Sequence, residues 1–250
     1  MRADLVLLAV FGLSVETAYG FVLAPGSRAR VPPAPHAVSA PIMQQTVDGV
    51  RVGPPPDLPS LLLNNRIIYL GAPLVPSVTE VIVAQLLYLN YENPSKGVYM
   101  YVNSVGGGAQ AGAMETEAFA IADTMNYVSP EIETICLGTA FGTAAMLLAN
   151  GAKGKRACLP NSSLMLKEPM SSTRGQASDI ALRAREVLVT RQIILTMLSE
   201  STGQPIEKIK TDSLRSKYLN ADQALAYGIV DKILKSEDDL PAKPSFLSEL

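Results

Sequence analysis

Two glycine-containing stretches of the chain have residue types that could stabilise or attack a reacting group. Residues 103–107 place paired glycines behind an apolar stretch, and glycine lets backbone N–H groups approach an oxyanion without an intervening side chain. Residues 137–146 are typical of a strand that turns sharply into a helix and presents a nucleophile at the helix N-terminus. The chemistry would be that of a hydrolase. A close-packed turn explains either stretch equally well, so neither identifies a reaction alone.

Histidine is nearly absent from the chain. It occurs once, at His36, in an N-terminal stretch that we expect to be removed. The folded part therefore lacks the usual general base near neutral pH and the commonest metal ligand. The two cysteines, Cys136 and Cys158, lie in apolar runs, which indicates buried reduced thiols, and we expect no metal site and no cofactor. A hydrolase scaffold without a proton shuttle predicts a structural or regulatory copy of an enzyme.

The composition limits the class of protein. The chain has 250 residues, of which 48% are hydrophobic, which is enough for a large core. The formal net charge is −2, with both signs interspersed, so we predict neither nucleic-acid binding nor membrane-surface binding.

The first residues have the composition of a two-part leader. Residues 1–20 read as a signal peptide whose apolar run is too short to span a membrane, and residues 21–47 contain no acidic residue, as in transit peptides. Two signals in series predict import into the plastid stroma of an alga with a secondary plastid. The alternative is a plain secretory leader followed by a linker. We expect an extended arm over residues 48–64 and a disordered tail over residues 237–250.

Strands and helices are predicted to alternate between residues 65 and 236, which indicates one α/β domain with largely parallel pairing. The first helix is predicted to open with a capping box that starts at Ser77. The predicted strands are 66–71, 98–102, 133–137, 156–159, 164–166 and 229–234. The predicted helices are 77–91, 111–127, 143–150, 175–201, 205–214 and 221–227.

Ten short blocks occur in a fixed order between about residue 66 and residue 234. They are 66–71 (RIIYLG), 85–89 (QLLYL), 103–107 (NSVGG), 134–138 (TICLG), 151–156 (GAKGKR), 159–162 (LPNS), 175–179 (GQASD), 184–186 (ARE), 202–204 (TGQ) and 227–228 (YG). This series resembles the proteolytic subunit family of the Clp protease, ClpP and its relatives. The resemblance implies a ClpP/crotonase-like α/β fold with repeated β-β-α-type units and a long protruding helix that joins two rings.

The family's catalytic residues do not carry over to this chain. The position of the nucleophilic serine holds Gly142, that of the general-base histidine holds Lys167, and that of the orienting aspartate holds Ser216, although Asp212 lies nearby. The oxyanion-hole backbone positions, Gly107 and Thr143, remain. Glycine has no hydroxyl group to form an acyl-enzyme, and a lysine ammonium group is a poor base. The chain therefore resembles the non-catalytic ClpR type of subunit.

Two alternatives stay open at this point. The first is an active peptidase in which Thr143 replaces the serine and Lys167 serves as its base. The second is an acyl-CoA enzyme of the crotonase type, whose paired glycines would hold a thioester oxyanion.

The resemblance also implies partners. Family subunits form seven-membered rings, two rings enclose a chamber for unfolded substrates, and a hexameric ATPase docks into apolar clefts. Seven of the cleft positions hold apolar or aromatic residues, namely Leu87, Tyr99, Tyr101, Tyr127, Leu137, Leu159 and Leu234. A further cleft position, which usually holds an aromatic residue, is Ala157 in this chain. Residues 113–119 resemble an insertion, which we expect near the chamber wall or the substrate path.

Overall fold

The computed structural model describes residues 46–47, 50–51, 58–107 and 115–236. The chain divides into two compact units, Met1–Pro54 and Pro55–Leu250. In the first unit, β1 (Thr46–Val47) pairs with β2 (Val50–Arg51) in an antiparallel hairpin. Most of the predicted leader, the predicted tail and residues 113–114 of the predicted insertion lie outside the described residues.

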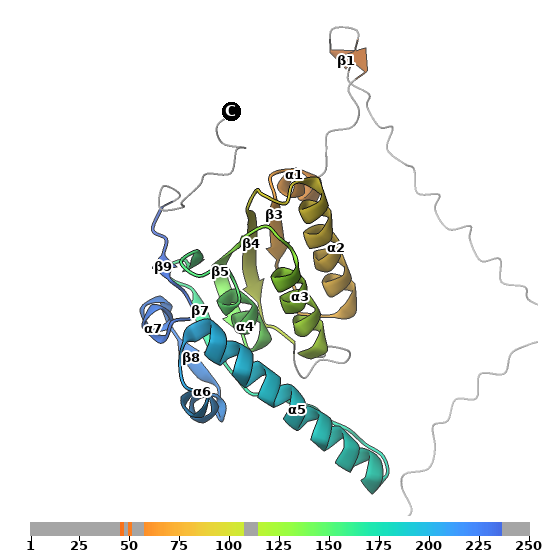
Figure 1. Ribbon diagram of the computed structural model, residues 1–250, viewed down its shortest axis with the longest axis vertical. Helices are drawn as coiled ribbons and strands as arrows, with labels where there is room; N and C mark the ends of the chain where they lie inside the picture. Colours follow the sequence, from red (N-terminus) through yellow and green to blue (C-terminus); the bar gives the residue numbers. More distant parts are fainter. Residues whose placement is uncertain (1–45, 48–49, 52–57, 108–114, 237–250) are drawn as a thin grey trace, which may run out of the picture. The chain divides into compact units, whose positions relative to one another are not determined.

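The second unit is built on a sheet in which the described strands follow the order β3-β4-β5-β6-β9. Each neighbouring pair along this path is parallel. A further strand, β7, pairs in parallel with the far end of β5 and antiparallel with β8 (Figure 1). The strands are β3 (Ile67–Leu70), β4 (Val98–Ser104), β5 (Ile132–Phe141), β6 (Arg156–Cys158), β7 (Ser163–Leu166), β8 (Lys217–Leu219) and β9 (Lys232–Ile233). This arrangement confirms the predicted α/β fold.

Helices alternate with these strands along the chain. They are α1 (Leu58–Asn64), α2 (Pro76–Glu92), α3 (Glu115–Tyr127), α4 (Thr143–Ala149), α5 (Ala177–Thr202), α6 (Ile206–Ser213) and α7 (Ala221–Tyr227). Within the described residues, no helix is both long enough and apolar enough to cross a membrane.

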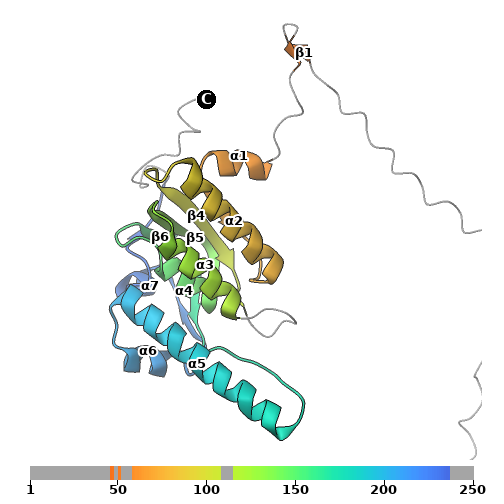
Figure 2. The same ribbon diagram turned by 45° about the vertical axis from the view of Figure 1, so that its right-hand side comes forward.

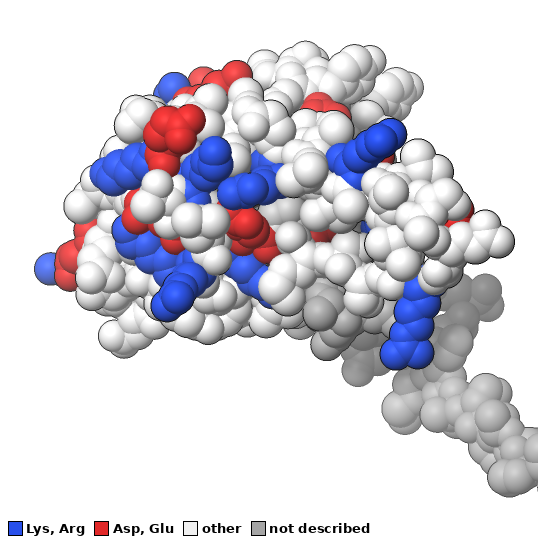
Figure 3. All heavy atoms as spheres, turned by 90° about the horizontal axis from the view of Figure 1, so that it is seen from below, with Lys and Arg blue, Asp and Glu red and all other residues white. Residues whose placement is uncertain are grey.

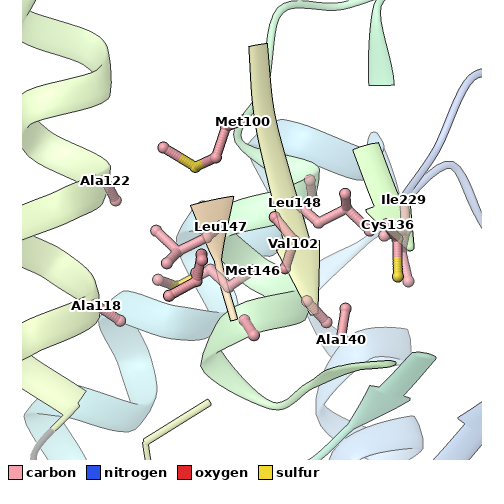
Figure 4. Packing of buried hydrophobic residues seen from close by; sticks show 14 of the residues in the cluster. Met100, Val102, Ala118, Ala122, Cys136, Ala140, Met146, Leu147, Leu148 and Ile229 are labelled. Carbon is pink, nitrogen blue, oxygen red and sulfur yellow. The ribbon is translucent and has the colours of Figure 1, made fainter. Parts of the chain in front are cut away.

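The main core lies between one face of the sheet and the helices. Met100 and Val102 of β4 and Cys136 of β5 point toward α3 and α4, where Ala118 and Leu147 are fully buried (Figure 4). Because successive strand residues point to opposite faces, Tyr99 and Tyr101 lie on the other side. There they form a smaller cluster with Ile135, Ala157, Leu159 and Leu234. We call this side the second face of the sheet.

Two predicted features are wrong. The expected extended arm over residues 48–64 ends in a helix, α1, whose seven residues include three consecutive leucines. The predicted capping box at Ser77 does not form, because Pro76 already occupies the first helical turn and Val75 is the N-cap. A real capping box joins Asn220 to Gln223 at the start of α7.

Two buried arginines connect the ends of several elements. The Arg66 guanidinium donates hydrogen bonds to the carbonyl oxygens of Leu89, Asn93, Lys96 and Gly97 and to the Glu92 carboxylate, all at 2.9–3.1 Å. It thereby satisfies carbonyl groups at and beyond the C-terminus of α2, where a helix leaves its last acceptors unpaired.

Arg156 makes a similar set of hydrogen bonds toward the opposite edge of the sheet, at the start of β6. Its guanidinium binds both oxygens of Asp231, at 2.6 and 2.8 Å, and the carbonyl oxygens of Ala149 and Ser201, at 3.1 and 2.9 Å. One side chain therefore joins β6 to the ends of α4 and α5 and to the segment before β9.

Cys136 and Cys158 confirm the prediction of buried, reduced thiols. They are in register on β5 and β6, and both are free and fully buried. Burial raises the pKa of the Cys136 thiol to about 12 and also raises the pKa of Cys158. Because the thiolate is the reactive form, neither thiol should react in the folded protein.

We therefore expect iodoacetamide to leave both cysteines unmodified in the native chain and to alkylate both in concentrated urea. Mass spectrometry of the intact protein measures the number of labels. Rapid labelling of either thiol without denaturant would show that the strands β5 and β6 open far more readily than this packing indicates.

The long helix α5 has two different halves. Its C-terminal half packs into the core through Ile194, Leu195 and Leu198, whereas its N-terminal half extends beyond the sheet (Figures 1 and 2). Large apolar side chains are exposed on the extended half and on the segment that precedes it, namely Met170, Ile180, Leu182, Leu188 and Val189. A cluster of exposed apolar side chains on a helix is typical of an interaction surface.

Candidate functional site

The strand–helix turn at Gly142 has the geometry of a nucleophile elbow. Gly142 follows β5 directly, precedes α4 and has φ 56° and ψ −115°, a conformation that L side chains rarely adopt. Its N–H donates to Met165 O at 2.8 Å, and its carbonyl accepts from Met146 N–H at 3.2 Å. A Cβ atom at Gly142 would have no heavy atom within 4 Å. The turn therefore has the backbone of a nucleophile elbow and has space for a Cβ atom at position 142, although the residue there is glycine.

The glycine pair beyond β4 packs directly against this elbow. Gly106 has φ 74°, and a Cβ atom on it would lie 2.4 Å from Phe141 O, so only glycine fits there. The Ser104 hydroxyl accepts from Gly106 N–H at 3.1 Å and donates to Ala72 O at 2.7 Å. These two bonds fix the loop to the segment that follows β3, and the close approach of Gly106 to Phe141 O places it against the elbow.

A single hydrogen bond joins the glycine pair beyond β4 to the first residue of α4. The Gly107 N–H donates a hydrogen bond to Thr143 Oγ1 at 2.8 Å. Thr143 is the first residue of α4 and is only 5% exposed. The two predicted oxyanion-hole positions are thus adjacent, but the Gly107 donor is already engaged by a side chain of the same protein.

A small pocket lies beside this contact. It is lined by Gly107, Gly142, Thr143, Lys167 and Glu168, together with Glu115, Pro169, Met170 and Ile194. The cavity volume is ≈ 20 Å³, which is room for about one water molecule. The structure therefore brings together four of the predicted site residues, Gly107, Gly142, Thr143 and Lys167.

Lys167 is half-buried in the pocket wall. Within the described part of the chain, no hydrogen bond joins its ammonium group to Thr143, whose hydroxyl oxygen instead accepts from Gly107. Glu168, the next residue, forms an ion pair with Arg191 of α5. The geometry therefore does not show the threonine–lysine pair that an alternative peptidase needs.

The residue at the third predicted triad position does not line the pocket, although it precedes Lys217, which pairs with Leu166 beside Lys167. Ser216 is exposed and is not among the residues that line it. The nearby Asp212 accepts hydrogen bonds from Lys217 Nζ at 2.7 Å and from Tyr227 Oη at 3.0 Å. Burial would raise the pKa of Asp212, but these two hydrogen bonds and the charges of Lys217 and Lys208 together outweigh it and lower the pKa below its usual value. Asp212 is thus bound to α7 and β8 rather than directed at a base.

The seven predicted docking residues divide into two surfaces. Tyr99, Tyr101, Leu159 and Leu234 belong to the second face of the sheet, and Leu137 shares it by strand alternation. Leu87 lies on α2 and Tyr127 at the end of α3, and both side chains are exposed on the helical side. A single chain does not bring all seven residues together.

Sequence reasoning missed part of the second face. Ile67 and Tyr69 of β3 stand opposite Tyr99 and Tyr101 in the register, and Tyr69 is half-exposed. The alternation of side chains with a period of two residues over 67–70 was the sequence signal that could have identified them.

Glu133 adds a buried carboxylate to this side of the sheet, and Lys155 Nζ binds it at 2.9 Å. Burial, and secondarily Glu133, raise the pKa of Tyr99.

Charged side chains of both signs are mixed on one face of the described part of the chain (Figure 3). On the face shown in Figure 3, Lys and Arg lie among Asp and Glu side chains, with uncharged areas between them. Within the described residues, no group of three or more His, Cys, Asp or Glu side chains could hold a metal ion.

Comparison with known proteins agrees with this geometry. A family model described as Clp protease matches residues 56–237. The chain is 49% identical over 207 residues to a putative ATP-dependent Clp protease proteolytic subunit-like protein of Synechococcus elongatus, covering 77% of this chain and 91% of that protein. It is 47% identical over 190 residues to ATP-dependent Clp protease proteolytic subunit 2 of Gloeobacter violaceus, covering 76% and 85%.

A plant relative is also similar. The chain is 46% identical over 187 residues to the chloroplastic ATP-dependent Clp protease proteolytic subunit-related protein 4 of Arabidopsis thaliana, covering 74% of this chain and 61% of that protein. The matched segment contains the elbow, the glycine pair and the whole sheet. With a family match over more than half of its length and the fold that this family implies, the chain belongs to the Clp protease family of proteolytic subunits.

Proposed function

We propose that this chain is a non-catalytic core subunit of the plastid ATP-dependent Clp serine protease complex. The observation that carries the proposal is Gly142 at the elbow, where a serine peptidase needs a hydroxyl group. The chain contributes to ring assembly and to ATPase docking, and other subunits of the complex cleave the unfolded protein substrates.

The other site residues support the absence of catalysis. Thr143, the nearest hydroxyl group, is buried and accepts a hydrogen bond from Gly107. Ser216 is exposed and does not line the pocket, and Asp212 is engaged by Lys217 and Tyr227. Near Gly142, the described residues therefore do not include a nucleophilic side chain that is hydrogen-bonded to a base.

The distribution of apolar residues supports a ring. Because Leu87 and Tyr127 lie on the helices and the other docking residues lie on the second face, a complete docking cleft requires residues from two chains. Adjacent subunits of a seven-membered ring supply such a pair. The exposed apolar side chains on the extended half of α5 suit contact with a second ring.

Plastid localisation is part of the same proposal. It rests on the acid-free residues 21–47 behind the signal-like residues 1–20, and on similarity to a relative whose name calls it chloroplastic.

Affinity purification of the tagged chain from plastids, followed by subunit counting by native mass spectrometry, tests the assembly. We expect a double ring that contains this chain together with subunits that carry an active serine. Recovery of a free monomer without other Clp subunits would contradict the proposal.

Treatment of the isolated chain with a hydroxyl-directed active-site probe tests the catalytic status. We expect no labelling. Stoichiometric labelling at Thr143 would instead support a peptidase with a substitute nucleophile, and saturable binding of an acyl-CoA would support the crotonase-type alternative.

Substituting Gly142→Ser should supply a hydroxyl group without restoring activity, because no histidine stands at position 167 to activate it. The backbone at φ 56° should make this variant less stable by about 1–3 kcal/mol. Urea unfolding and probe labelling measure the two effects. Gly142→Ala is the matched control, with the same strain and no hydroxyl group. Full labelling of the serine variant would show that Lys167 can act as a base.

A further inference from the structure

Thr143 makes a hydrogen bond that the loss of the serine does not explain. Its hydroxyl oxygen accepts the Gly107 N–H at 2.8 Å and so joins the glycine pair beyond β4 to the first turn of α4. The Gly107 N–H is also the donor that the family resemblance places in the oxyanion hole. The bond therefore affects a second catalytic component, which is distinct from the nucleophile.

The distance from Gly107 N to Thr143 Oγ1 matches the distance at which an oxyanion hole binds a substrate oxygen. An oxyanion hole places its N–H donors about 2.7–3.1 Å from the oxygen that becomes negatively charged. Thr143 Oγ1 lies at that distance from Gly107 N, so the side-chain oxygen stands where a substrate oxygen would accept the same hydrogen bond. A substrate could use this donor only after moving the threonine.

The surroundings leave little room for such a movement. Thr143 is buried, and Gly106 approaches so closely that a Cβ atom on it would lie 2.8 Å from Thr143 Oγ1. The adjoining pocket of ≈ 20 Å³ has space for about one water molecule. A peptide carbonyl group would therefore have to compete with the threonine hydroxyl group for the Gly107 N–H donor.

We propose that Thr143 is a positioning residue that closes the oxyanion hole from inside the chain. The site would then stay inactive toward acyl substrates even if serine, histidine and aspartate returned to positions 142, 167 and 216. This inference rests on the proposed function, because it adds a second and separate cause of inactivity to the missing hydroxyl group at Gly142.

Amide hydrogen exchange at Gly107, followed by NMR in the full chain, tests the contact itself. Thr143→Val removes the hydroxyl group at nearly constant volume, and Thr143→Ser keeps it. We expect exchange about tenfold faster in the valine variant than in the native chain, and near-native exchange in the serine variant. Equal exchange in all three proteins would overturn the proposal.

A chain with a rebuilt triad tests the functional consequence. In Gly142→Ser/Lys167→His/Ser216→Asp, we expect that the further change Thr143→Ala raises kcat/KM for p-nitrophenyl acetate by about 10²–10³-fold, because it releases one oxyanion-hole donor. Thr143→Ser in the same background should not raise it. Equal rates with threonine and alanine at position 143 would overturn the proposal, and if no rebuilt chain turns over, the exchange result decides it.

The outcomes separate this inference from the proposed function. Ester or peptide hydrolysis by the unchanged chain would contradict the non-catalytic role as a whole. A rebuilt chain that is fully active with Thr143 present would contradict only the closed oxyanion hole.

Discussion

Replacing Arg66 with alanine is expected to lower the free energy of unfolding by about 3–5 kcal/mol, because it removes a buried cation that donates to four backbone carbonyl groups and to Glu92. The Arg66 side chain is 3% exposed. Its loss removes the guanidinium donor from the carbonyl oxygens of Asn93, Lys96 and Gly97, whereas Leu89 O still accepts from Asn93 N–H. Since whole domains are stable by only about 5–15 kcal/mol, this variant should unfold at a much lower urea concentration.

Two further variants isolate the cause. Arg66→Met keeps the aliphatic stem and removes the guanidinium group, so it should be nearly as unstable as the alanine variant. Arg66→Lys keeps a charge but has fewer donors and should be intermediate. Arg215→Ala, at an exposed position, is the matched surface control and should change stability by less than about 0.5 kcal/mol. An Arg66→Ala loss as small as that of the control would refute the capping role of Arg66.

Asp231→Asn should lower stability at neutral pH by about 3 kcal/mol, because it leaves the buried Arg156 without its counter-charge. The Arg156 side chain is 5% exposed and binds both carboxylate oxygens of Asp231. Burial would raise the pKa of Asp231, but the hydrogen bonds from Arg156 and from Gly154 N–H outweigh it and lower the pKa below its ordinary value of 3.8.

The sign of this shift determines the pH dependence. A carboxyl group with a lowered folded-state pKa binds fewer protons in the native state, so its contribution to stability is complete above the unfolded value of 3.8 and is lost as the pH falls through the lowered pKa. The native chain should therefore lose this contribution in acid, whereas Asp231→Asn should lack it at every pH. Urea unfolding between about pH 7 and pH 3 measures both curves.

The matched control for this pH series is Asp212→Asn. Asp212 also has a lowered pKa, but it binds Lys217 and Tyr227 rather than a buried arginine. A smaller loss at neutral pH is expected because the cation partner of Asp212, Lys217, is 38% exposed, whereas Arg156, the partner of Asp231, is 5% exposed. A constant difference between the native and Asp231→Asn proteins down to the lowest pH would contradict the assignment to Asp231.

The central part of the fold was predictable because its patterns are local. Apolar runs over 98–102 and 133–137 gave the core strands β4 and β5, and α7 was predicted with both of its boundaries correct. Long-range features were missed. Strand β8 depends on pairing with β7, which lies about fifty residues earlier and is not visible in three residues of sequence. The continuation of β5 to Phe141 likewise depends on β7, which pairs with its far end.

In the candidate site, too, local features were predicted from the sequence and long-range contacts were not. Residue types alone placed Gly142 and Thr143 at a strand–helix turn, and the structure has that turn. The hydrogen bond from Gly107 to Thr143 joins residues 36 positions apart, so only the folded chain reveals it. The network of Arg66 was missed for a similar reason, because its acceptors are backbone carbonyl groups that carry no sequence signature.

The exposed apolar residues on the extended half of α5 should limit the amount of this protein that accumulates in a cell. Ile180, Leu182, Leu188 and Val189 face water in the single chain, and such a surface promotes self-association unless another protein covers it. Synthesis in excess of its neighbours would leave surplus copies that precipitate or are degraded. Its abundance should therefore follow that of the proteins it binds, and overproduction alone should yield insoluble material.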